Sequence, residues 1–580
     1  MVSLMPAPIK RLRSRTTPFL VFASLVTLFI TWLVVFPLVS MLIRAFTTDG
    51  VIDLSGFQIL TRPAIVQTIV NTGIALGLAV LAATIIGSLF AWLNERTDAS
   101  MGPVTDVLPI VPLMIPPVAG AIGWVFLAAP GAGLLNGLIR RVLEGFGISM
   151  STGPLNINSW TGLIFVYTLY LVPIIYLVVS SSLRGLDSSF EEASRVSGAS
   201  AFETFRRITL PAIAPSVASA AVLALVIGLA LFSVPVVVAT GARIDILAVE
   251  IIRLIRTFPA QTDAAIVLGI VMLVAVGAAW SIQFALRKAG HYASVGGRAS
   301  HKSRVRLGVW RTPARVIMVL YLAATSVLPF LALFLVSMQG FWSPNIQWRA
   351  LSLSNYRTVL FDDRATVDAI RNSVMLATIG ATLAVLIAVT VAYFVIRTHR
   401  VGRAADGVVK LPGAVSNIII GVAFLVAFSG SPFFLGGTLW ILLLAYITIN
   451  MPQASLTAGT ALEQVGQDLW ESSYVSGATE SKTFRKILIP LALPGLVAGW
   501  AMVFVLMVGD LAVSSMLAST GTRVVGFVLL DLWQFGIYPK VATFAVGISF
   551  LALTIVSSVL LIMRQRGGAK LLAGSTTRAS

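Results

Sequence analysis

A short polar motif occurs twice in this very apolar chain. The first copy reads Glu192-Ala193-Ser194-Arg195-Val196-Ser197-Gly198, followed after nine residues by Ile208-Thr209-Leu210-Pro211. The second copy reads Glu471-Ser472-Ser473-Tyr474-Val475-Ser476-Gly477, followed after the same interval by Ile487-Leu488-Ile489-Pro490. Because each copy is a polar island between long apolar runs, the pair predicts two related loops in a tandem repeat.

The composition identifies the broad class of protein. The 580 residues are 57% hydrophobic and only 11% charged, whereas soluble domains carry about 25% charged residues. The apolar runs are long enough for membrane-spanning helices and lack the short alternating segments of outer-membrane barrels. The sequence therefore predicts an all-α polytopic membrane protein.

About twelve transmembrane helices are expected, as two parallel six-helix repeats. A repeat of six spans returns to its starting side, so the second repeat keeps the orientation of the first. The apolar runs of the first repeat lie near 19–43, 66–93, 108–128, 161–183, 211–239 and 264–287. Those of the second lie near 313–338, 372–396, 409–430, 437–460, 489–515 and 542–563.

The predicted domains follow from these runs. The first repeat covers 1–287 with its polar loop at 186–211, and the second covers 313–566 with its loop at 465–490. A basic linker at 288–312 joins them, and 567–580 form a tail. The first run, 19–43, is too long for a cleaved signal peptide and is expected to remain as a span.

The distribution of charge predicts orientation and excludes other functions. The net charge is +18, but Lys and Arg lie mostly in short loops, as the positive-inside rule requires, so no nucleic-acid partner is expected. The linker and both termini are basic and are placed on the cytoplasmic side of the membrane. With no Cys and three His beside basic loops, neither a metal site nor disulfides are expected.

Each polar island predicts two short helices joined by a glycine. Ser188 and Glu191, like Ser200 and Glu203, have the spacing of a capping box at the start of a helix. Gly198 and Gly477 stand where a chain reversal requires positive φ. Pro211 and Pro490 open the next apolar run, where proline is tolerated in a first helical turn.

Both islands resemble the coupling motif, or EAA motif, of binding-protein-dependent ABC importer permeases of the type I class. That motif is Glu-Ala-Ala, three residues, Gly, nine residues, then Ile-x-Leu-Pro. The first copy matches it, with Ser194 in the third position, at Glu192, Ala193, Gly198, Leu210 and Pro211. The second copy departs further and has Glu471, Ser472, Gly477, Ile489 and Pro490. The resemblance covers essentially the whole chain and implies a fused, two-in-one permease.

The resemblance implies partners for the chain. In this family each coupling loop inserts into a groove of an ABC ATPase subunit, here expected as a homodimer that binds ATP and Mg, while the chain itself is expected to carry no cofactor. The sequence contains no G-x-x-x-x-G-K-[ST] motif, so the chain is predicted to be a transport subunit and not an enzyme. A periplasmic or lipid-anchored solute-binding protein is expected to deliver the cargo.

Several cargoes stay open. A two-in-one chain looks most like the permeases for ferric iron, and the segment 240–253 resembles that type. Thiamine permeases come next, and a phosphonate or a polyamine is also compatible. Few side chains in the apolar runs are hard metal ligands, so a receptor would have to coordinate iron.

Five residues are candidates for the translocation pathway. Asp510 is an ionisable group at the outer end of the eleventh run, where it would face a cavity, a partner or the interface. Asn71 and Asn372 occupy equivalent positions and are expected to cap or cross-link helices rather than to touch cargo. Pro116-Pro117 should break the third run, as a packing kink or a gate.

Two other classes of function are less well supported. An ion-coupled secondary transporter would require intramembrane carboxylates or broken-helix ion sites in both halves, and Asp510 is the one good candidate. A membrane-embedded enzyme would require clustered His, Asp or Glu at the membrane face, and the sequence shows no such cluster.

Overall fold

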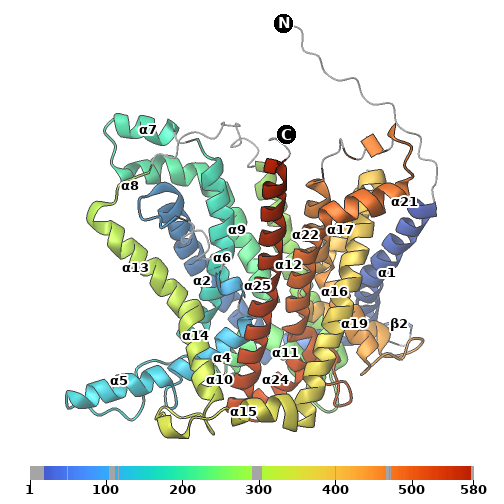
Figure 1. Ribbon diagram of the computed structural model, residues 1–580. Coiled ribbons are helices and arrows are strands. Elements are labelled where there is room, and N and C mark those ends of the chain that lie inside the picture. Colours follow the sequence, from blue (N-terminus) through green and yellow to red (C-terminus); the bar gives the residue numbers. More distant parts are fainter. Residues whose placement is uncertain are drawn as a thin grey trace.

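The structure, a computed structural model, is a bundle of long helices (Figure 1). It describes residues 18–48, 50–102, 111–114, 116–187, 189–289, 304–398, 400–465, 469, 472–473 and 475–576. Within these residues ten helices are long and apolar enough to cross a membrane, or eleven if one bent pair counts as a single span. The predicted all-α polytopic class is confirmed.

The first half is a series of long helices with short ones between them. Its elements are α1 (Pro18–Phe46), β1 (Thr47–Thr48), β2 (Val51–Ile52), η1 (Ser55–Thr61), α2 (Pro63–Arg96), η2 (Val111–Met114), α4 (Pro117–Ala128), α5 (Leu134–Gly145), α6 (Trp160–Gly185), α7 (Ser189–Val196), α8 (Ala201–Thr204), η3 (Phe205–Thr209), α9 (Leu210–Ala230), α10 (Ser233–Ala242), α11 (Leu247–Arg256) and α12 (Thr262–Ala289). The two strands form a small antiparallel hairpin after α1.

The second half repeats this order. Its elements are η5 (Gly308–Trp310), α13 (Arg311–Leu322), η6 (Ala323–Val327), α14 (Leu328–Ser337), η7 (Trp348–Ala350), α15 (Ser354–Arg357), η8 (Thr358–Asp362), α16 (Arg364–Thr398), α17 (Arg400–Lys410), η9 (Leu411–Ala414), α18 (Asn417–Phe428), α19 (Leu439–Glu463), α21 (Glu480–Thr483), η10 (Phe484–Leu488), α22 (Ile489–Val508), α23 (Ala512–Leu517), α24 (Val525–Gln534) and α25 (Tyr538–Thr576). Helix α25 continues beyond residue 566, where the second repeat was predicted to end.

The third apolar run differs from a simple span in both halves, which is why fewer than twelve long helices are found. In the first half α4 is only 12 residues long and begins at Pro117, directly after Pro116. In the second half the segments 401–414 and 417–428 are bent by 106°. There Ser416 accepts a hydrogen bond from the Ile418 amide at the start of α18. A proline pair and a serine cap thus start short helices at equivalent places.

The two halves exchange their first helices. Helix α1 packs against α16 and α18 of the second half, and α14 packs against α4 of the first. Aromatic rings form part of the first contact, with Phe36 of α1 5.7 Å from Phe428. In the second contact the Trp124 indole donates to the Ala324 carbonyl. This exchange makes the two repeats one body, with a shared core.

The end of α2 is also joined to the segment that leads into α13 and to α13 itself. Val305 forms a parallel bridge with Thr97, just after α2. Arg315 of α13 donates to the carbonyls of Asp98, Ala99 and Ser100. The rest of the predicted linker, 290–303, lies outside the described residues. The part from 304 onward is therefore bound to the first half.

Candidate coupling loops and translocation pathway

The first polar island folds as predicted into two short helices. Helix α7 ends before Gly198, which has φ of +86° and reverses the chain. Helix α8 begins after Ser200, whose hydroxyl accepts from the Glu203 amide. A π-helical turn at 205–209 then leads into α9, which has Pro211 in its first turn. Glycine is required at 198 because other side chains are strained at positive φ.

The second island has the same conformation where it is described. Gly477 has φ of +75°, the Thr479 hydroxyl accepts from the Lys482 amide, and a π-helical turn at 484–488 precedes α22. Pro490 lies in the first turn of that helix. Glu471 lies outside the described residues, as does Ser188, the predicted capping residue at the start of the first island.

The serine at the third position of each motif copy, where the family motif has alanine, forms the same kind of hydroxyl contact in both loops. The hydroxyls of Ser194 and Thr204 are 2.9 Å apart, and those of Ser473 and Thr483 are 2.8 Å apart. Each pair joins the first short helix of its loop to the second. Sequence reasoning missed this link, although serine at the third position of both copies was a usable signal.

Both loops expose a similar set of side chains. Val196 and Val475 occupy equivalent positions and are each 89% exposed. Phe190 and Leu469, also equivalent, are exposed as well. The other predicted coupling residues that the structure describes are exposed or half-buried, and they are Glu192, Ala193, Leu210, Pro211, Ser472, Ile489 and Pro490. Apolar side chains in water are stabilised by a partner that covers them.

The two loops lie at the same end of the bundle. Figure 1 places α7 and α8 at the same end as α21 and as the last turns of α25. Helices α10, α11 and α24 lie at the opposite end. The bundle therefore presents both islands to one side, at a distance from each other.

A buried ion pair fastens the first loop to the long helices. Arg96, at the end of α2, lies 3.5 Å from the Glu191 carboxylate of α7, and both side chains are only 6% exposed. The Thr209 hydroxyl also donates to Glu191, at 2.7 Å. Arg96 further donates to the carbonyls of Leu183 and Leu186 at the end of α6, where a cation is favourable. Sequence reasoning assigned Glu191 only a capping role.

A second acid next to Arg96 extends this network. The buried Glu95 carboxylate accepts from Arg184 of α6 at 2.7 Å and from the Ser180 hydroxyl at 2.6 Å. Together Glu95 and Arg96 connect α2 to both α6 and α7. Buried charges of this kind require partners, because an unpaired charge inside the protein is costly.

The equivalent positions of the second half cannot form this network. Ile396 stands in place of Glu95, Trp470 in place of Glu191 and Leu488 in place of Thr209. An aromatic contact is instead common to both halves: Trp92 packs on Phe205 and Tyr393 on Phe484. The two loops therefore share ring contacts, and among the described residues the buried ion pair lies beneath the first loop alone.

The two asparagines suggested for the pathway hold equivalent loops. Asn71 donates to the Asp245 carbonyl and Asn372 to the Arg523 carbonyl. The next residue in each helix is Thr72 or Ser373. Its hydroxyl accepts from the backbone amide two residues after the bound carbonyl, which is that of Leu247 or Val525. These clamps set the start of α11 and of α24, as expected of cross-linking residues.

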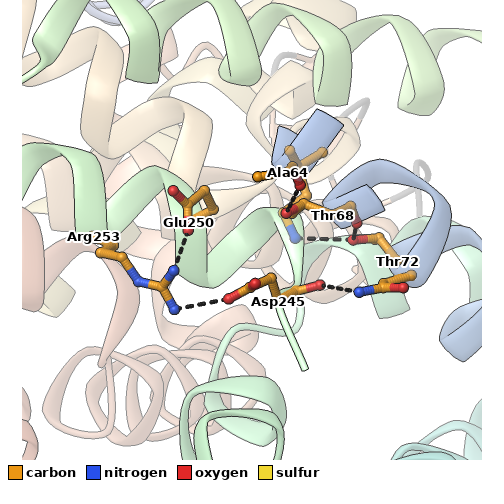
Figure 2. A network of polar contacts seen from close by, with 8 residues as sticks. Ala64, Thr68, Thr72, Asp245, Glu250 and Arg253 are labelled. Carbon is orange, nitrogen blue, oxygen red and sulfur yellow. Dashed lines mark hydrogen bonds and ion pairs between the residues drawn. The ribbon is translucent and has the colours of Figure 1, made fainter. Parts of the chain in front are cut away.

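Figure 2 shows the surroundings of the first clamp, with the Arg253 guanidinium between Glu250 and Asp245. Burial raises the pKa of the Glu250 carboxyl, an effect that Arg253 opposes. All three residues belong to the first half, on or just before α11. The ion pairs therefore stabilise α11 within its own half.

Asp510 lies at the break between α22 and α23. Its carboxylate accepts from the amide and the hydroxyl of Ser514, and the Ser514 hydroxyl is 2.7 Å from the Tyr446 hydroxyl. The side chain is buried and occupied by these donors. This geometry accounts for an acid at the end of a span, because the Asp510 carboxylate, one residue before the N-cap Leu511, accepts from a free amide in the first turn of α23, and a role in the pathway stays a prediction.

A cavity of about 840 Å³ lies between the halves, among the helices of the end opposite the coupling loops. Its wall includes Asn158, Arg253, Arg256, Trp342, Gln534 and Tyr538. Among the described residues, no group of three or more His, Asp or Glu is placed to hold a metal ion. The wall thus offers cationic, amide and aromatic groups.

The chain belongs to the family of binding-protein-dependent transport system inner membrane components, whose model matches residues 83–288 and 380–565. The match occurs once in each half, on the helices that carry the coupling loops. The protein is therefore a multi-pass inner-membrane permease of an ABC importer, a transport subunit. Membership of this family implies an ATPase and a solute-binding protein as partners.

Individual relatives differ in the cargo that their names state. The chain is 25% identical over 511 residues to ferric transport system permease FbpB 1 of Haemophilus influenzae, covering 86% of this chain and 78% of the relative. It is 24% identical to the ferric transport system permease FbpB of Actinobacillus pleuropneumoniae, over 88% of this chain and 74% of the relative. The spermidine/putrescine permease PotC of Haemophilus influenzae is 29% identical, over 38% of this chain and 85% of the relative.

Proposed function

We propose that this chain is the whole membrane channel of a ferric-iron importer, driven by two copies of one ATPase docked on its two coupling loops. The observation that carries the proposal is the pair of loops with one conformation. Both have a glycine of positive φ at the same position, and both expose a valine to the same extent. Two identical grooves require two such matching surfaces.

The choice of iron rests on the relatives. Those that align with most of the chain are named for ferric transport, whereas the polyamine permease aligns with 38% of it. A polyamine is therefore the second candidate, and thiamine or a phosphonate is compatible with the same machinery. A ferric ion prefers hard oxygen ligands, so the solute-binding protein would coordinate it and the permease would provide the passage.

The energy for transport would come from the hydrolysis of ATP, which the ATPase binds together with Mg. The coupling loops, both termini and the linker would then lie in the cytoplasm, in agreement with the basic residues around them. The end that carries α11 and α24 would face the solute-binding protein.

Docking is tested by changing the exposed valines. Val196→Asp and Val475→Asp each place a charge in the proposed apolar contact, and we expect loss of ATPase co-purification that is largest in the double variant. The matched control is Val51→Asp, which changes a valine 69% exposed in β2. Retention of the ATPase by the double Val196/Val475 variant would contradict docking at the loops.

The cargo is tested by uptake into proteoliposomes that contain the permease, its ATPase and its solute-binding protein. Radioactive ferric iron should accumulate in an ATP-dependent manner, whereas labelled spermidine should not. Accumulation of spermidine without iron would overturn the choice of cargo and leave the importer assignment intact.

A further inference from the structure

Helices α11 and α24 are equivalent elements of the two halves at the end opposite the coupling loops. Before each helix an asparagine side chain donates to a backbone carbonyl, and a neighbouring hydroxyl accepts from the backbone amide two residues after that carbonyl. Counted from the clamped residues Leu247 and Val525, Arg253 of α11 corresponds to Asp531 of α24. Arg256 corresponds to Gln534 in the same way.

Both helices contribute to the wall of the cavity between the halves. Ile252 of α11 and its equivalent Leu530 of α24 line it, as do Arg256 and its equivalent Gln534. A cavity lined by equivalent residues of two repeats lies close to the axis that relates them. In parallel repeats that axis runs along the membrane normal, so the cavity lies where a path through the bundle would begin.

One ion pair joins these two helices across the cavity region. The Arg256 guanidinium lies 2.6 Å from the Asp531 carboxylate, and the side chains are 27% and 30% exposed. The same guanidinium lies 5.5 Å from the centre of the Phe527 ring, also on α24. Partial burial and an aromatic neighbour both strengthen an ion pair relative to one in open water.

The charges at equivalent positions explain why this pair can form. Arg253 is bound within its own half by Asp245 and Glu250. The equivalent residue of the second half, Asp531, has the opposite sign, and Val528 stands in place of Glu250. The ion pair that the structure describes for Asp531 is with Arg256 of the other half, whereas an arginine at 531 would repel Arg256.

We propose that the cavity is the entrance chamber of the solute pathway and that the Arg256–Asp531 pair is the latch that closes it between transport cycles. Opening the entrance would separate α11 from α24 and break this pair, and closing it would form the pair again. Docking of the loaded solute-binding protein would favour the separated state. The inference rests on the proposed importer function and adds the residues that gate it.

Charge reversal tests the latch. Arg256→Asp and Asp531→Arg each place like charges opposite one another, so each should raise ATP hydrolysis in the absence of the solute-binding protein severalfold. The double variant restores an attractive pair and should return that activity close to the wild-type level. A matched control is the exposed pair Arg44–Asp263, which joins α1 to α12 within the first half at 3.3 Å. Its single reversals should leave basal hydrolysis unchanged.

Cross-linking tests the movement itself. The chain has no native cysteine, so Arg256→Cys/Asp531→Cys can be joined by a short, reducible bifunctional methanethiosulfonate. The joined protein should lose the stimulation of ATP hydrolysis by the loaded solute-binding protein and regain it on reduction. Each single cysteine variant, treated in the same way, should keep it.

The outcomes separate the latch from the function on which it rests. Full stimulation in the joined protein, or failure of the double reversal to lower basal hydrolysis, would overturn the latch. If the wild-type permease does not bind the ATPase at all, the docking proposal is overturned instead. The hydrolysis readout does not depend on which cargo the solute-binding protein carries.

Discussion

The two coupling loops have nearly the same internal geometry but different attachments to the helices behind them. Within each loop, a glycine of positive φ and a pair of hydroxyls hold the short helices together. Behind the first loop, Arg96 and Glu191 form a buried ion pair, whereas Trp470 replaces Glu191 in the second half. The surface that a partner meets can thus be conserved between copies while its support changes.

This difference in attachment predicts that the two loops move differently relative to the helices behind them. Arg96 binds α7 and the end of α6 together, so we expect the first loop to move as one body with α2 and α6. The second loop is supported by the ring contact of Tyr393 and Phe484, and such a contact is worth about 0.5–1.5 kcal/mol beyond the area that it buries. The following substitutions test this contrast, from the largest expected effect to the smallest.

Removing the cation should affect the first loop most. Arg96→Met removes a charge partner of the buried Glu191, and loss of one partner of a buried pair costs about 3–5 kcal/mol. Arg397→Met, at the equivalent position, should cost clearly less because no acid stands at residue 470. The measurement is the loss of folded protein on heating in detergent, and equal losses in the two variants would remove the contrast.

Removing the hydroxyl that binds Glu191 should have an intermediate effect. Thr209→Val keeps the shape of the side chain but removes a buried hydrogen bond to a charged group, worth about 1.5–3 kcal/mol. Thr209→Ser retains the hydroxyl and serves as the control. A midpoint of thermal unfolding that is the same for Val and Ser would show that this bond adds little.

The two glycines should respond alike, because their conformation is shared. Gly198→Ala and Gly477→Ala each force a side chain into positive φ, at a cost of about 1–2 kcal/mol. A Cβ at either position meets no atom within 4 Å, so the strain arises from the backbone alone. Binding of the ATPase, measured by titration, should weaken to a similar extent in both, and a strong effect in one alone would indicate unequal grooves.

The hydroxyl pairs should give the smallest and most equal effects. Ser194→Ala and Ser473→Ala each remove one hydrogen bond between short helices, worth about 1 kcal/mol. Thermal unfolding of the purified variants should shift downward by the same small amount. A shift confined to Ser194→Ala would mean that the first loop depends on this link and the second does not.

Much of the local structure of the loops was predictable. Gly198, Gly477, Pro211 and Pro490 each have a conformational preference that acts within a few residues, and all four lie where the sequence placed them. The repeat was also predictable, because equivalent residues recur in the same order in both halves, 301 residues apart for Asn71 and Asn372 and 279 apart for Gly198 and Gly477. The long helices followed from apolar length, except where Pro116 and Ser416 begin short ones.

The partners of charged residues were not predictable from their neighbours in the chain. Glu191 looked like part of a capping box, but in the fold its carboxylate is bound by Thr209 and by Arg96 of a distant helix. Asp510 was expected to face a cavity, a partner or the interface, and in the fold its carboxylate accepts from Ser514 at the break between α22 and α23. In both cases several uses of one carboxylate were compatible with the sequence.

By itself the sequence determined the membrane class, the two-fold repeat and the two coupling loops, because these depend on apolar length, on periodic recurrence and on backbone preferences. Only the tertiary structure decided that the first loop has a buried ion pair beneath it and that Arg256 of one half binds Asp531 of the other. The physical reason is that a charge acts on whatever the packing of helices brings within a few ångströms. Arg96 and Glu191, like Arg256 and Asp531, are far apart in the chain and become partners only where the helices that carry them pack together.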